Sequence, residues 1–171
     1  MDFMELAQKR YSVRKFADRP VEAEKLAQIL AAGRIAPTAK NQQPQRIYVL
    51  QSAAAMAKLA ELSPCVYGAP LALVFTYDRD EEWQNPYEEG VHSGVEDVSI
   101  VATHVMLQAT ELGLGTCWCN MFPNSKLEEA LGLPKNERSV LFLLVGYAAP
   151  DAAPAPRHEE CKDLATTVKY L

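Results

Sequence analysis

Apolar residues recur at two spacings along the chain, and each spacing predicts one kind of secondary structure. Positions three and four apart predict helices, whereas short apolar runs bounded by turn residues predict strands. Helical spacing marks residues 3–9, 22–34, 53–62, 96–112 and 125–131. Strand patterns mark residues 46–51, 71–77, 114–122 and 140–147, and the run at 114–122 leads into a loop. The order of these elements predicts one α/β layered domain over residues 1–171.

Residues with capping chemistry stand at several of the predicted helix ends. Asp2 followed by Glu5 predicts a capping box, and Ser52 and Ser125 stand where helix N-caps are expected. Gly113 follows the helix at 96–112 as its expected C-cap. The strand at 71–77 is apolar throughout, which predicts a central strand whose two faces are both covered.

The pattern leaves open the surroundings or the role of three regions. The helix at 96–112 is apolar nearly all round, which predicts burial either in the core or against a second subunit. Residues 78–92 are acidic and aromatic without periodicity, which predicts a surface loop or a lid. The tail from about residue 150 is rich in proline and has no core of its own, so we expect it to lie along another surface.

Composition and charge exclude several functional classes. The chain has 171 residues, 49% of them hydrophobic, and a formal net charge of -5, which argues against non-specific nucleic-acid binding. No apolar run approaches the roughly 18 residues that span a membrane, and the first residues lack the order of a signal peptide. We therefore expect a cytoplasmic protein with no membrane segment. The four cysteines are expected to be buried or idle thiols, because the Cys117/Cys119 pair has no second pair at metal spacing.

Two polar stretches are candidates for binding. Residues 10–16, RYSVRKF, place three cations and a hydroxyl together in an acidic chain. Arginine offers a planar fork of donors that fits two phosphate oxygens, so the hypothesis is a cofactor phosphate, with a solvated basic turn as the alternative. Residues 36–45, APTAKNQQPQ, are rich in neutral donors and acceptors that suit a planar heterocycle, with a plain polar connector as the alternative.

Common catalytic motifs are absent from the sequence. Gly113 and Gly115 follow a predicted helix instead of opening one, so they do not form a dinucleotide loop. The chain contains neither a phosphate-binding P-loop nor a Gly-x-Ser-x-Gly elbow. If the protein is an enzyme, we expect a cofactor to carry its chemistry.

Four motifs in order resemble the nitroreductase family of FMN-dependent oxidoreductases. They are Arg10-x-Ser12-x-Arg14, the stretch Ala36-Pro37-Thr38-Ala39-x-Asn41-x-Gln43-Pro44, the stretch from Glu111 to Trp118 (ELGLGTCW), and Gly146-Tyr147 followed by Pro-x-Pro-Arg157. The resemblance covers nearly the whole chain. It implies an α+β fold with a mixed, largely antiparallel sheet sandwiched by helices. It also implies a homodimer that binds FMN at the subunit interface, with the tail at about 150–171 packed on the partner.

The resemblance also implies roles for single residues. Arg10, Ser12 and Arg14, with the Tyr11 backbone, would hold the phosphate and ribityl chain, and Arg157 would return to the phosphate. The flavin would be contacted by Pro37, Thr38 and Asn41, by Gln43 from the partner subunit, and by Trp118, Cys119, Asn120 and Met121 along the ring. No protein side chain would act as a nucleophile.

The implied activity is a ping-pong reaction. FMN would take a hydride from NADH or NADPH and then reduce a small-molecule electron acceptor, such as a nitroaromatic or a quinone. The alternative is a flavin-binding carrier or sensor without turnover. Two departures from the family pattern bear on this choice: Gln45 stands where an aromatic residue often follows Gln-Pro, and Arg157 lacks a second arginine or lysine beside it.

Overall fold

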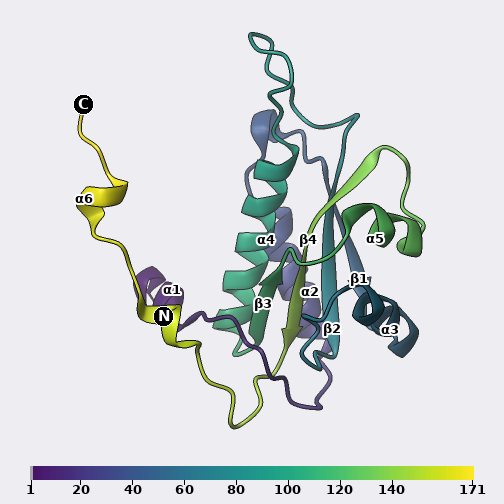
Figure 1. Ribbon diagram of the computed structural model, residues 1–171, viewed down its shortest axis with the longest axis vertical. Helices are drawn as coiled ribbons and strands as arrows, with labels where there is room; N and C mark the ends of the chain where they lie inside the picture. The colour runs from purple at the N-terminus through teal and green to yellow at the C-terminus, as the bar shows by residue number, and fades with distance from the viewer. Residues whose placement is uncertain (1) are drawn as a thin grey trace.

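A four-stranded antiparallel sheet forms the centre of the computed structural model, which describes residues 2–171 (Figure 1). Its strands are β1 (Gln45–Leu50), β2 (Leu71–Asp78), β3 (Gly115–Cys119) and β4 (Glu137–Gly146). They lie in the order β1-β2-β4-β3, and each neighbouring pair is antiparallel. β2 is buried along its whole length, so the prediction of a central strand is confirmed.

Six α-helices and two 3-10 helices make up the other regular elements of residues 2–171. They are α1 (Phe3–Lys9), α2 (Ala23–Arg34), η1 (Ala39–Asn41), α3 (Ala53–Leu62), α4 (Gly94–Glu111), α5 (Asn124–Leu131), η2 (Pro156–Glu159) and α6 (Leu164–Thr167). The five helices expected from the apolar spacing are all present, with ends that differ by at most two residues. The short turns η1, η2 and α6 carry too few apolar positions for a periodic signal.

Capping chemistry explains two of these helix starts. The Glu5 main-chain N–H donates to the Asp2 carboxylate at 2.9 Å, and the Asp2 N–H donates back to Glu5 at 3.2 Å, which confirms the capping box. The Ser52 hydroxyl accepts from the Ala55 N–H at 3.1 Å, as expected.

The expected cap at Ser125 is wrong. α5 begins at Asn124 after Pro123, and no side chain caps it. Proline pre-sets the backbone angle that starts a helix, and the Asn124 side-chain amide instead donates to the Ser139 carbonyl on β4 at 2.7 Å. Ser125 therefore lies inside the first turn.

Helices cover both faces of the sheet, which confirms the expected sandwich. α2 and α4 pack on one face, where Ile29, Val101 and Val105 meet Leu73 and Leu143. α2 and α4 lie close together because Gly33 has no side chain: a Cβ at this position would stand 2.8 Å from Val105. On the other face, α3 and α5 contribute the buried side chains of Leu59 and Leu127.

The structure answers in part how α4 is buried, which the sequence left open between the core and a second subunit. The apolar face of α4 that contains Val98, Val101 and Val105 lies in the core and is fully buried. On another side of the same helix, Val95 and Ile100 remain exposed. α4 is therefore a core helix with a second, uncovered apolar face.

The C-terminal tail leaves the body of the molecule after β4. η2 lies beside α1, and α6 stands apart from the sheet and its helices (Figure 1). The apolar side chains of Leu164, Val168 and Tyr170 are exposed there. Within residues 2–171, no helix combines the length and the hydropathy that crossing a membrane requires.

Candidate functional site

The basic stretch at residues 10–14 is held along the edge of the sheet. Arg10 is the C-cap of α1, and the chain then runs beside the start of β3. The Val13 N–H donates to the Thr116 carbonyl at 2.8 Å, and Ser12 forms a parallel bridge with the same residue. Val13 is 1% exposed, whereas the Arg14 side chain next to it reaches the surface. The stretch is therefore a fixed edge segment that presents its polar side chains outward.

A small cavity lies behind this stretch. It has a volume of about 130 Å³ and is bordered by Arg10, Tyr11, Gly113 and Gly115, with Thr110 of α4 on its wall. Of the basic stretch, Arg10 borders this cavity, whereas Ser12 and Arg14 do not line it. The stretch as a whole carries two arginines and a serine hydroxyl within five positions, a set of donors that fits a phosphate ester. The residues present thus suit the phosphate end of FMN.

The amide-rich loop is fixed at the start of α4. The Ala39 N–H donates to Asp97 at 2.8 Å, and the Ser93 hydroxyl donates to the same carboxylate at 2.7 Å. Lys40, Asn41 and Gln43 have φ values of 49°, 56° and 54°. Backbone strain of this kind in residues other than glycine is concentrated at functional sites.

Within this loop, the side chains make local contacts. The Thr38 hydroxyl accepts from the Gln43 N–H at 3.0 Å, and the Gln43 side-chain amide donates to the Asn41 carbonyl at 3.2 Å. Pro37, Asn41 and Gln43 are exposed. The loop thus presents uncharged donors and acceptors at the surface.

The two candidate stretches lie at opposite ends of α4. Asp97 in its first turn holds the amide loop, and Thr110 in its last turn borders the cavity beside Arg10. These two positions are 13 residues apart, which corresponds to about 20 Å along a helix at 1.5 Å per residue. A single chain therefore does not bring Asn41 and Gln43 to the basic stretch.

The end of β3 supplies the other residues expected along the flavin. The Trp118 indole N–H donates to the Asn120 side-chain oxygen at 2.6 Å, and the Asn120 amide donates to the Val140 carbonyl at 2.8 Å. Cys119 points to the opposite face of the sheet from Trp118, as alternation in a strand requires. Met121 follows, with 65% of its surface exposed.

Two residues absent from the sequence prediction lie in the same region. The segment between α3 and β2 carries Cys65 and Tyr67, and the Cys65 sulfur lies 3.8 Å from the Met121 sulfur. Interaction with the Cys65 side chain, together with burial, raises the pKa of Tyr67, while nearby Arg14 opposes the shift. Tyr67 and Gly68 both have positive φ, which marks a tight turn, but no sequence pattern signals its position in space.

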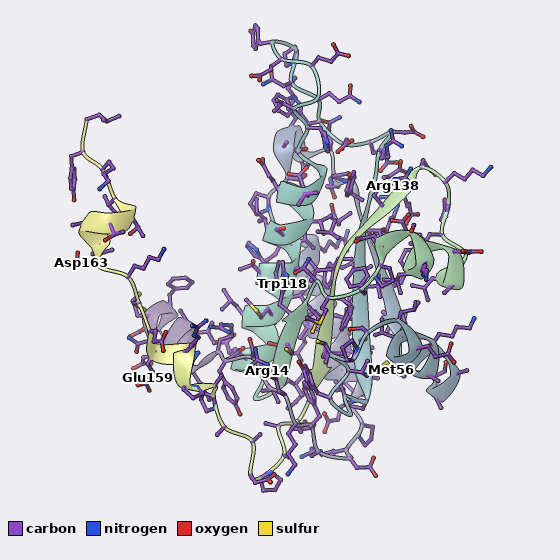
Figure 2. All side chains as sticks on the ribbon, in the orientation of Figure 1. Arg14, Met56, Trp118, Arg138, Glu159 and Asp163 are labelled. Carbon is purple, nitrogen blue, oxygen red and sulfur yellow. The ribbon has the colours of Figure 1, made fainter. Side chains whose placement is uncertain are left out.

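The sulfur atoms form a cluster beside Arg14, seen near the centre of the molecule in Figure 2. The Cys119 thiol donates to the Cys117 sulfur at 3.8 Å and approaches the Cys65 carbonyl oxygen at 3.6 Å. The hydrogen bond from Cys119, aided by the positive charge of Arg14, lowers the pKa of Cys117 to about 7 against the effect of burial. Across residues 2–171, no three His, Cys, Asp or Glu side chains are grouped to hold a metal ion.

Arg157 lies on the tail, next to the N-terminal helix. Its side chain is 89% exposed, and its Nε atom is 3.8 Å from Glu160. The following residue, His158, stacks edge-on against Tyr11 with 6.2 Å between ring centroids. The tail is thereby attached close to the basic stretch, although the Arg157 guanidinium remains free to contact a ligand.

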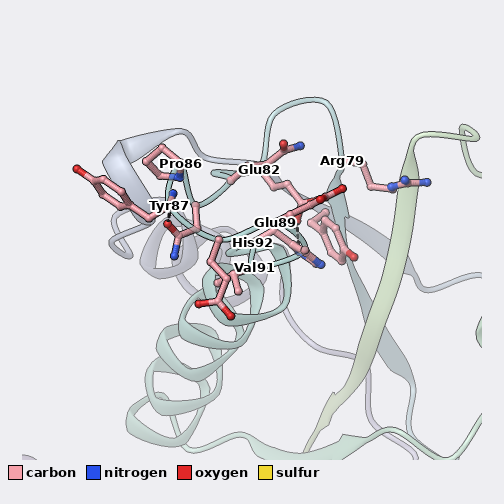
Figure 3. A pocket seen from close by; sticks show the side chains of 12 residues that line it. Arg79, Glu82, Pro86, Tyr87, Glu89, Val91 and His92 are labelled. Carbon is pink, nitrogen blue, oxygen red and sulfur yellow. Dashed lines mark hydrogen bonds and ion pairs between the residues drawn. The ribbon is translucent and has the colours of Figure 1, made fainter.

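The acidic loop lines a second, open cavity of about 530 Å³ (Figure 3). His92 Nδ1 lies 2.6 Å from a Glu82 oxygen, which also accepts from the Gly94 N–H at 3.1 Å. These contacts fasten the loop to the start of α4. Arg46 connects it to the amide loop: its guanidinium lies 2.7 Å from Glu81 and donates to the Gln43 carbonyl at 3.5 Å.

Comparison with known proteins places this arrangement in a family. The model of the nitroreductase family matches residues 7–65 and 62–147. A nitroreductase family protein from Clostridium difficile 630 is 42% identical in sequence, with a TM-score of 0.93 over 99% of this chain and 98% of that chain.

Curated relatives agree with this result. A protein of Archaeoglobus fulgidus named putative NADH dehydrogenase/NAD(P)H nitroreductase is 30% identical over 82% of this chain and 81% of its own. The Bacillus subtilis FMN reductase [NAD(P)H] is 29% identical over 85% of this chain and 66% of its own. The chain belongs to the nitroreductase family, as its four motifs indicated.

Proposed function

We propose that this protein is an FMN-dependent NAD(P)H oxidoreductase that works as a homodimer in the cytoplasm. It would reduce nitroaromatics, quinones or related electron-poor compounds by a ping-pong mechanism. The observation that carries the proposal is the basic stretch of Arg10, Ser12 and Arg14, held rigidly against β3 by the bond from Val13 to Thr116. The names of the relatives, among them an FMN reductase [NAD(P)H], support both FMN and the nicotinamide donor.

The basic stretch would bind the phosphate end of the cofactor. Arg10 and Arg14 supply charge-assisted hydrogen bonds, and the Ser12 hydroxyl adds a neutral donor. Because Val13 is buried and its N–H is bonded to Thr116, the main chain of the stretch is fixed before the ligand arrives, which reduces the entropy lost on binding. Arg157 would add a further positive charge from the tail.

The other wall of the site would come from a second subunit. Asn41 and Gln43 lie at the opposite end of α4 from Arg10, so the amide loop of a partner is needed to complete a compact pocket. The exposed apolar face of α4 and the exposed apolar residues of α6 are surfaces that a partner would cover. A tail extended away from its own body suits exchange with the second copy.

The flavin ring would lie against the end of β3, from Trp118 to Met121. The chemistry that FMN supplies when bound is acceptance of a hydride from NAD(P)H and its transfer to the acceptor. The protein would bind and orient both substrates and exclude water. The four free thiols suit a reducing compartment, which supports the cytoplasmic location.

The test is a spectrum followed by an assay. The purified protein should show the absorbance of bound flavin, or gain it on incubation with FMN, and should oxidise NADH or NADPH when a quinone is added. A protein that stays colourless with added FMN would refute the proposal. Bound FMN that neither nicotinamide reduces would favour the alternative, a flavin carrier or sensor.

A further inference from the structure

No sulfur atom of the cluster beside Arg14 reacts in the proposed flavin chemistry, although Cys119 lies in the segment that would border the ring. Cys117 and Cys119 occupy positions i and i+2 of β3, so their side chains lie on the same face of the sheet. Their sulfur atoms are 3.8 Å apart, and both side chains are buried. The hydrogen bond donated by Cys119 makes Cys117 the sulfur that ionises first. A thiolate beside a thiol is the arrangement that oxidants attack most readily.

We propose that Cys117 and Cys119 are a redox-active dithiol that hydrogen peroxide oxidises reversibly to a disulfide within β3. The inference does not depend on the flavin chemistry, since it concerns the chain's own sulfur atoms and a small external oxidant.

The chemistry balances with peroxide as the only oxidant. The Cys117 thiolate attacks one peroxide oxygen, the O–O bond breaks, hydroxide leaves and Cys117 becomes a sulfenic acid. The Cys119 sulfur then attacks the Cys117 sulfur, the S–S bond forms and the sulfenic hydroxyl leaves. Together the two thiols lose two electrons and two protons, and one peroxide becomes two water molecules.

The position of β3 in the sheet allows this bond. Alternate Cα atoms of an antiparallel strand are about 6.8 Å apart, at the upper limit of the disulfide range of about 4.4–6.8 Å. The two Cβ atoms must also approach to about 3.5–4.5 Å, so β3 must bend out of its extended conformation between the two cysteines. β3 is the outermost strand of the order β1-β2-β4-β3, so it is paired along its full length only with β4. A disulfide formed at the limit of this range is readily reduced again.

A chain of side-chain contacts connects the pair to the surface. The Cys119 sulfur lies 3.6 Å from the carbonyl oxygen of Cys65, and the Cys65 sulfur is in contact with Met121. Cys65 is half-buried and Met121 is largely exposed, so this chain of contacts leads from Cys119 to the surface. Arg14, whose charge favours the Cys117 thiolate, borders the same cluster.

Peptide mapping of the peroxide-treated folded protein tests the assignment. Trypsin should release residues 80–126 as one peptide that contains Cys117 and Cys119, and residues 59–79 as another that contains Cys65. The protein is treated with peroxide, denatured and then alkylated with maleimide before digestion. We expect the peptide of residues 80–126 to carry no maleimide and to be lighter by about two mass units than the reduced peptide. The number of thiols that can be titrated after unfolding is four in the reduced protein and should fall by the two that pair. Dithiothreitol should restore the original number.

Single serine variants provide the controls. Cys117→Ser and Cys119→Ser should each abolish the bond, whereas Cys161→Ser, at the exposed and distant cysteine, should retain it. Two alkylated thiols in residues 80–126 after peroxide would overturn the proposal, as would a cross-link between residues 59–79 and 80–126. The wild-type mapping is repeated with and without added FMN, which separates the outcome from flavin binding. Because this mapping uses no variant, it does not depend on whether the serine variants fold.

Discussion

The main-chain N–H of Ala39 donates a 2.8 Å hydrogen bond to the buried carboxylate of Asp97. This contact fixes the amide-rich loop to the first turn of α4. The same carboxylate accepts from the Ser93 hydroxyl, so one side chain satisfies donors from two segments. The position of the loop relative to α4 depends on this residue.

Asp97→Ala should therefore destabilise the protein and loosen the loop. Burying the Ala39 donor without a partner costs about 1–3 kcal/mol in the free energy of unfolding, which urea denaturation measures. Hydrogen exchange at residues 38–43 should become faster. Asp97→Asn is the matched control, because it keeps an acceptor oxygen and should lose less. Equal stability of the Ala variant and the wild type would contradict this role.

Removing either arginine of the basic stretch should weaken FMN binding. Each charge-assisted hydrogen bond contributes about 1.5–3 kcal/mol, so Arg10→Ala and Arg14→Ala should each raise the FMN dissociation constant by about ten- to a hundredfold. Fluorescence titration of the flavin-free protein measures this. Lys126→Ala, at an exposed position of α5, removes one charge outside the stretch and should bind FMN normally. Unchanged affinity in both arginine variants would make the stretch a solvated turn.

Gly115 allows the basic stretch to lie against β3. A Cβ at this position would stand 2.6 Å from a Val13 methyl carbon. Gly115→Ala should therefore displace Val13 and the residues beside it, at a cost of about 1–3 kcal/mol in unfolding free energy, with weaker FMN binding. Adding Val13→Ala to this variant should recover part of the FMN affinity, because it removes the clash. If the double variant binds FMN less tightly than Gly115→Ala, the clash is not the cause.

Tyr48 should make stability depend on pH in the alkaline range. Burial, and then a 2.8 Å hydrogen bond to Glu137, raise the pKa of Tyr48 from 10.0 to about 12. Below pH 10 the phenol is protonated in both states and its stabilisation is complete. Between pH 10 and about 12 the unfolded chain ionises first, so stability falls as pH rises through the folded pKa.

Urea unfolding of the wild type and of Tyr48→Phe, at about pH 9 and about pH 11, measures this dependence. The loss of stability between the two conditions should be smaller in the variant. Tyr87→Phe, at a residue 96% exposed, should lose as much as the wild type. If all three proteins lose the same stability between the two pH values, groups other than Tyr48 cause the loss.

The apolar side chains of the tail should contribute to a dimer. Burying one leucine side chain stabilises by about 1.5–3 kcal/mol, and a symmetric dimer contains each substitution twice. Leu164→Lys should thus weaken dimerisation by about a hundredfold or more, as measured by sedimentation velocity over a dilution series. Thr166→Lys adds the same charge to the same turn and should leave the dimer intact. Equal dimerisation of both variants would exclude Leu164 from the interface.

Interactions between residues near one another in the chain were sufficient to predict the order of the helices and strands. Capping by Asp2 and Ser52, and apolar spacing along α2 and α4, act within one or two helical turns, so the sequence alone determined these helices. The apolar run Leu71–Phe75 of β2 likewise determined its central place. The exception is α5, whose start depends on a contact from Asn124 to a strand that follows later in the chain.

The sequence identified the separate stretches of the candidate site but not their arrangement in space. The sequence identified the basic stretch and the amide loop, because cations and amides reveal their binding chemistry wherever they lie. Only the tertiary structure placed them at opposite ends of α4, and only it brought Cys65 and Tyr67 to Arg14 and the thiols of β3. Such contacts join segments far apart in the chain, and the packing of helices on both faces of the sheet, which no local pattern encodes, decides them.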